Sequence, residues 1–123
     1  MSLIRAVALK DFRATALSTS ANGSAISTAG PNSGERLHAA LHLTAVSTDR
    51  TFAGSIQAAS SSGFAAVTSE IQFALTSERA SSWQTLTAPS TDRPYRRFAW
   101  TISTAGGSTA GSWNGLAWIG FRS

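Results

Sequence analysis

The sequence predicts an all-β fold, namely a single-domain antiparallel β-sandwich of jelly-roll type. The segment 95–103 is the clearest strand, because Phe98, Trp100 and Ile102 fall on one side of an extended chain and the residues between them fall on the other. Seven to nine short segments of this kind recur at roughly ten-residue spacing, separated by turn residues. No segment is convincing as a long helix, so two sheets packed face to face are expected.

The N-terminal part of the chain predicts short strands joined by turns. Residues 3–18 fit one or two strands with a break near Lys10 and Asp11, and a short helix is the alternative. The pair Asn22 and Gly23 predicts a hairpin between the two flanking segments, because both central positions of a type I′ turn need a positive φ.

The segment 36–46 fits two templates. As a strand it turns Leu37, Leu41 and Leu43 to one face, and as a helix it gathers Leu37, Ala40 and Leu41 into an apolar stripe. The strand is favoured because the segments that follow are strand-like and an isolated short helix is marginal.

The rest of the chain reads as strands and polar turns. The expected strands are 51–58, 69–75, 83–87, 95–103 and 116–122. Residues 106–115 are expected to form a glycine- and serine-rich hairpin loop that contains Trp113. We expect one domain overall, with an N-terminal arm and hairpin in 1–40 and the sandwich core in 41–123.

The composition predicts a thin core. Ala, Ser, Thr and Gly account for 66 of the 123 residues, and there is no cysteine to form a disulfide or a thiolate metal site. A core of small side chains gains little from burial of apolar area, so self-association or docking on a larger body would stabilise it.

The positive charge lies in the C-terminal third. The net charge is +4, and residues 79–123 carry five arginines against Asp92 alone. The arginines are Arg79, Arg93, Arg96, Arg97 and Arg122. They are either solvated side chains beside a strand or a docking surface for an acidic partner, since arginine forms planar, bidentate pairs.

The motifs of catalysis, cofactor binding and metal binding are missing. His38 and His42 have a spacing compatible with a metal, but no carboxylate or cysteine accompanies them. Neither a nucleophile elbow nor a phosphate-binding or dinucleotide fingerprint occurs. We therefore expect no enzyme, cofactor or metal. The start of the chain does not read as a secretory signal and no stretch reads as a membrane span, so a soluble protein made in the cytoplasm is expected.

Two binding functions remain as alternatives. The aromatic residues suggest a carbohydrate-binding β-sandwich, in which Trp113, placed in a loop without an evident core role, would contact a partner. Nucleic-acid binding would use Arg93, Arg96 and Arg97 with Tyr95 as a stacking platform, but the basic patch is small and nucleic acid is not an expected partner.

A family resemblance covers about two thirds of the chain. From residue 41 onward the order is Leu-His-Leu-Thr-Ala-Val-Ser, a Ser-rich turn at 60–63, Ile-Gln-Phe-Ala-Leu at 71–75 and Tyr-Arg-Arg-Phe-Ala-Trp-Thr-Ile at 95–102. This succession of strands and turns resembles small β-sandwich virion proteins of tailed bacteriophages, and it contains no catalytic signature.

The resemblance implies a structural protein of the virion. The implied role is a head decoration, or cement, protein that binds the outer capsid and clamps neighbouring subunits of the major capsid protein, or else a tail-associated component. A homo-oligomer is expected, with a trimer as the natural symmetry. The expected partner contacts are Leu3, Arg5 and Val7, in an N-terminal segment that adds a strand to a partner sheet, together with the residues Arg93, Arg96, Arg97 and Trp113.

Overall fold

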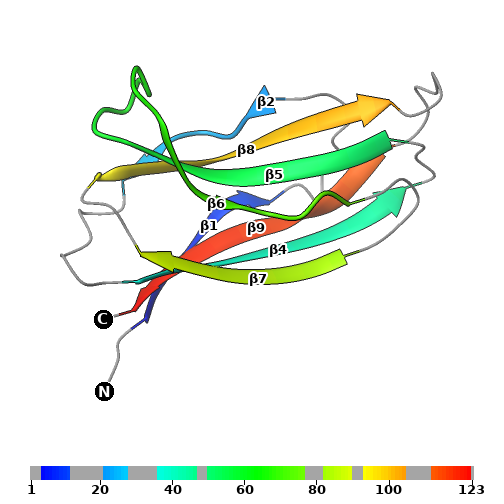
Figure 1. Cartoon of the computed structure of the whole chain (residues 1–123), viewed down its shortest axis with the longest axis horizontal. Coiled ribbons are helices and arrows are strands. Elements are labelled where there is room, and N and C mark those ends of the chain that lie inside the picture. Colours follow the sequence, from blue (N-terminus) through cyan, green and yellow to red (C-terminus); the bar gives the residue numbers. More distant parts are fainter. Residues whose placement is uncertain are drawn as a thin grey trace.

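Two antiparallel sheets lie face to face in the computed structural model (Figure 1). The described residues are 4–11, 21–27, 36–46, 50–76, 82–89, 93–104 and 112–122. Sheet A has the order β1 (Ile4–Asp11), β9 (Ser112–Arg122), β4 (Arg36–Val46) and β7 (Ser82–Pro89). Sheet B has the order β2 (Ala21–Asn22), β8 (Tyr95–Thr104), β5 (Arg50–Ala59) and β6 (Thr68–Gln72), and β3 (Ile26–Ser27) also pairs with β8.

The strand pairing is that of a jelly roll. The first strand pairs with the last (β1 with β9), the next two with the last but one (β2 and β3 with β8), then β4 with β7 and β5 with β6. A long hairpin wound into two sheets has this nesting, which is the two-Greek-key arrangement of jelly rolls. The predicted all-β, antiparallel, single-domain fold is confirmed.

The ambiguous segment 36–46 is a strand with these same bounds, β4, at the centre of sheet A. Its alternation explains the outcome, because Leu37, Leu41 and Leu43 are all fully buried on the face toward sheet B. A helix would have removed the pairing partner of both β7 and β9. Tertiary pairing therefore decides between two templates that the local sequence fits equally.

The core lies between the inner faces of β4 and β9 in sheet A and of β5 and β8 in sheet B. Phe52 stacks near Phe98 with ring centroids 6.1 Å apart, and it meets Trp113 edge-on at 5.9 Å. Gly54 leaves room for these rings, since a Cβ there would lie 2.7 Å from the Phe98 ring. The small residues of the sequence thus let a few aromatic side chains fill the space.

The predicted hairpin at Asn22 and Gly23 is wrong. Strands β2 and β3 do not pair with each other; both run along β8, and the Gly23 N–H donates to the Phe98 carbonyl at 2.6 Å. The segment therefore forms one interrupted edge of sheet B. Its turn signal is overridden because β8 offers an unpaired edge to the backbone of 21–27.

Two strand boundaries also differ from the prediction. Strand β6 ends at Gln72, and the chain then continues along β5 less regularly: the Phe73 N–H donates to the Gly54 carbonyl at 2.9 Å, and Thr76 bridges Phe52 with reciprocal backbone hydrogen bonds of 3.0 and 2.9 Å. Leu75, which strict alternation over 69–75 would place on the same face as the buried Ile71 and Phe73, is 62% exposed as a result. Strand β9 begins at Ser112, so the second part of the expected loop is strand.

The division of the chain at residue 40 finds no counterpart in the described residues. The boundary falls inside β4, and β1 pairs with β9 from Ile4 opposite Arg122 to Asp11 opposite Leu116, with a shift of register between Ala8 and Lys10. The described parts of the N-terminal segment are therefore strands of the sandwich rather than a separate arm.

Candidate functional site

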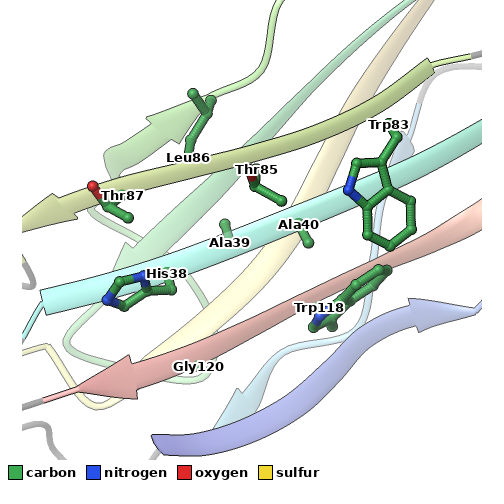
Figure 2. Close-up of a pocket in the computed structure, with 9 residues that line it drawn as sticks. All are labelled: His38, Ala39, Ala40, Trp83, Thr85, Leu86, Thr87, Trp118 and Gly120. Carbon is green, nitrogen blue, oxygen red and sulfur yellow. The ribbon is translucent and has the colours of Figure 1, made fainter. Parts of the chain in front are cut away.

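A groove on the outer face of sheet A is the most distinctive surface feature among the described residues. It has a volume of about 640 Å³. Two tryptophans, Trp83 on β7 and Trp118 on β9, lie over the intervening strand β4 with ring centroids 5.2 Å apart (Figure 2). Trp83 is 61% exposed, although it is one of the largest apolar side chains in the sequence. An exposed aromatic pair over a hollow is typical of a contact surface.

The register of three strands explains the hollow. Thr85 on β7, Ala40 on β4 and Trp118 on β9 form one cross-strand row, and in the next row His38 stands between Thr87 and Gly120. Ala40 has a small side chain and Gly120 has none, so these two residues form the low floor of the groove. Larger side chains stand on either side of it. Figure 2 shows His38, Thr85 and Thr87 along the groove, on the side of the strands that carries both tryptophans.

The aromatic row extends to His42. Its ring lies 5.4 Å from that of Trp83, tilted by 55°. His38 and His42 thus share the outer face of β4, as the strand prediction requires. Within the described ranges there is no group of three side chains that could hold a metal ion.

Arg96, expected in a docking surface, is fully buried. Its guanidinium makes a bidentate pair with Glu70, from Nε to Oε1 at 2.7 Å and from Nη2 to Oε2 at 2.9 Å, and it also donates to the Arg93 carbonyl. The Arg96 Cζ lies 4.9 Å from the centre of the Phe121 ring. A surface role for Arg96 is therefore wrong: the alternation that buries Phe98 also buries this residue two positions earlier.

The other two arginines of the predicted group are half-buried. Arg93 Nη1 donates to the Ala66 carbonyl at 3.3 Å. Arg97 Nε donates to Gln57 Oε1 at 2.8 Å, and its Cζ lies 4.3 Å from the centre of the Phe64 ring. Both side chains keep partial contact with solvent, and Arg97 does so on the face of β8 away from the core.

The prediction that Trp113 lies in a loop and contacts a partner is wrong, because Trp113 belongs to β9. It is fully buried in the core beside Phe52, so it cannot contact a partner in this fold. Leu3 lies outside the described residues. Arg5 and Val7 belong to β1, opposite Phe121 and Ile119 of β9, and their side chains lie outside the described part.

The aromatic groove itself was not predicted. Trp118 gives a usable signal in the sequence, since alternation over 116–122 places it on the opposite face from Ile119 and Phe121. Its partner Trp83 lies 35 positions earlier, and only the register of β4 with both neighbours brings the two together.

Comparison with known proteins relates the fold to a virus structure. No family model and no curated protein matches the sequence. A chain in a structure of infectious bursal disease virus, Gx strain, matches 98% of this chain with a TM-score of 0.54 and 12% sequence identity. The match covers 32% of that chain, so this protein spans about a third of the length of the chain it resembles.

The likeness concerns the fold. It supports the β-sandwich fold, and the virus concerned infects animals, so the tailed-phage part of the resemblance gains no support from it. In the described part of the chain no helix has the length and apolar character that crossing a membrane requires.

Proposed function

We propose that this protein is a structural component of a virion. The observation that carries the proposal is the match of nearly the whole chain to one segment of a longer chain in a virus structure. A jelly roll is an architecture on which capsid proteins are built, and it needs no catalytic group to act as a structural unit.

More specifically, we propose a head decoration protein of a tailed bacteriophage. It binds the outer surface of the capsid, contacts the major capsid protein and clamps neighbouring subunits, as a homo-oligomer with trimeric symmetry. A tail-associated position is the alternative. Strand β1 supports the clamp, because within the described residues it pairs only with β9, which leaves its other edge for a strand of a partner.

Binding to capsids tests this proposal. Purified protein is mixed with heads from particles that lack the gene product, and co-sedimentation is measured over a range of protein and salt concentrations. Saturable binding at a stoichiometry that matches the head symmetry is expected. Absence of binding to heads would contradict the decoration role, and binding to tails alone would favour the alternative.

The double variant Arg93→Ser and Arg97→Ser identifies the contribution of the basic surface. It spares Arg96, whose removal would disturb the core. If these half-buried arginines face an acidic capsid surface, the variant binds heads more weakly, with a lower dependence on salt. Thr101→Ala, an exposed substitution on the same strand, is the control and leaves binding unchanged.

A further inference from the structure

The groove on sheet A has the chemistry of a ligand site that the virion proposal does not use. Two indole rings, which lie against each other with centroids 5.2 Å apart, bound the groove at one end, and Ala40 and Gly120 form its floor. The residues that line it include no aspartate, glutamate, lysine or arginine. A volume of about 640 Å³ lies within the usual range of small-molecule sites, about 300–1,000 Å³.

The polar groups of the groove are uncharged hydroxyls and one imidazole, on His38, Thr85 and Thr87. The Thr87 oxygen accepts a hydrogen bond from Arg36 Nη2 at 3.4 Å, which leaves the threonine hydroxyl proton to donate elsewhere. The lining residues thus offer donors and acceptors but no carboxylate, ammonium or guanidinium, and the Arg36 guanidinium beside the groove is engaged with Thr87.

A sugar ring matches both the apolar and the polar groups of this groove. The C–H faces of a pyranose are apolar and pack on aromatic rings, while its hydroxyls act as donors and acceptors at the rim. A flat aliphatic or aromatic ligand would leave the threonine hydroxyls and the imidazole unused. A nucleic acid needs phosphate contacts that this groove does not contain.

We propose that this groove binds a neutral oligosaccharide. A pyranose ring packs against Trp83 and Trp118 above Ala40, and its hydroxyls exchange hydrogen bonds with Thr85, Thr87 and His38. The site lies on the outer face of sheet A, away from Arg93 and Arg97, and the inference does not depend on the virion proposal.

Calorimetric titration of the full-length protein with five neutral oligosaccharides tests the site. The probes are the pentasaccharides of cellulose, chitin and amylose, together with β-mannan and β-galactan oligomers. Saturable binding of at least one probe is expected. Trp83→Ala and Trp118→Ala should each weaken it at least about tenfold, which corresponds to the loss of about 1.4 kcal/mol of binding free energy.

Two further variants separate the groove from general effects on the fold. Leu75→Ala truncates another highly exposed apolar side chain, outside the groove, and should bind like the wild type. Thr87→Val keeps the shape but removes the hydroxyl, so it should weaken binding less than the tryptophan variants do. Circular dichroism confirms that each variant is folded.

The same preparations show what would overturn the proposal. Failure of all five probes to bind, or equal binding by Trp83→Ala and the wild type, contradicts it. If the probes fail and sedimentation velocity shows a dimer that Trp83→Ala abolishes, the groove is instead an interface between two copies of the chain. None of these results depends on whether the protein binds phage heads.

Discussion

At the residue scale, the ion pair between Arg96 and Glu70 joins β8 to β6 inside the protein. Both side chains are almost fully buried, at 0% and 1% exposure, and the pair is bidentate. Such a pair is costly to bury and costly to break, because removing one partner leaves the other charge without compensation. A surface pair of the same residues would contribute little.

Arg96→Met should destabilise the protein by about 3–5 kcal/mol, since it leaves the Glu70 carboxylate buried and unpaired. Urea unfolding measured by circular dichroism gives the change in free energy. The neighbouring variant Arg97→Met loses a hydrogen bond to the neutral Gln57 at a half-buried position, so a cost of about 1 kcal/mol is expected.

The double variant Arg96→Met with Glu70→Met removes both charges and should recover much of the loss of the single variant. If Arg96→Met alone proved as stable as the wild type, the buried ion pair would not exist in solution.

The position of Arg96 could be read from the sequence, whereas its partner could not. Alternation in 95–103 places Arg96 on the same side as Phe98 and Trp100, which are buried. Clustering of arginines in sequence suggested a surface patch instead. Glu70 lies 26 positions earlier, and only the pairing of β5 with both β6 and β8 brings the two residues close.

At the element scale, the pairing of β4 with β9 holds sheet A together. It runs from Arg36 opposite Arg122 to Val46 opposite Ser112. Gly115 permits the close approach in this pair, since a Cβ there would lie within 1.9 Å of the His42 carbonyl oxygen. No rotation of a flexible side chain can relieve that contact, because the obstacle is backbone.

Gly115→Ala should therefore destabilise the protein by at least about 2 kcal/mol, through displacement of β9 from β4. Gly63→Ala is the matched control, because a Cβ at that turn meets no atom within 4 Å, and its stability should equal or slightly exceed that of the wild type. Thermal unfolding of the two variants in parallel measures the difference. Equal melting temperatures would show that the register of β4 and β9 differs from this one.

A side chain also links the two sheets by hydrogen bonds between β7 and the segment that follows β6. Gln84 on β7 accepts a hydrogen bond from the Ala74 N–H at 2.8 Å and donates to the Ala74 carbonyl at 3.0 Å. Its amide thus acts as a backbone partner for the segment after β6. Bounds and faces of β4, β5 and β8 were predictable from alternation, but this inter-sheet contact depends on where β6 ends.

At the scale of the whole molecule, the jelly roll gives the chain two outer faces with different character. Sheet A presents the aromatic groove, and sheet B presents the half-buried Arg97 beside Gln57 of β5. The fold class followed from the number and spacing of strands, whereas the groove required the strand order of sheet A. A protein of this kind can attach to a particle through one surface and bind a ligand through another.

Cryo-electron microscopy of virus particles released by cells that carry the gene tests the central claim most directly. If the protein is a structural component of the virion, density for this two-sheet sandwich is expected at symmetry-related positions on the head. Mass spectrometry of the same particles should then detect peptides of the chain at a constant ratio to the major capsid protein. Particles that contain neither the density nor the peptides, in head or in tail, would contradict it.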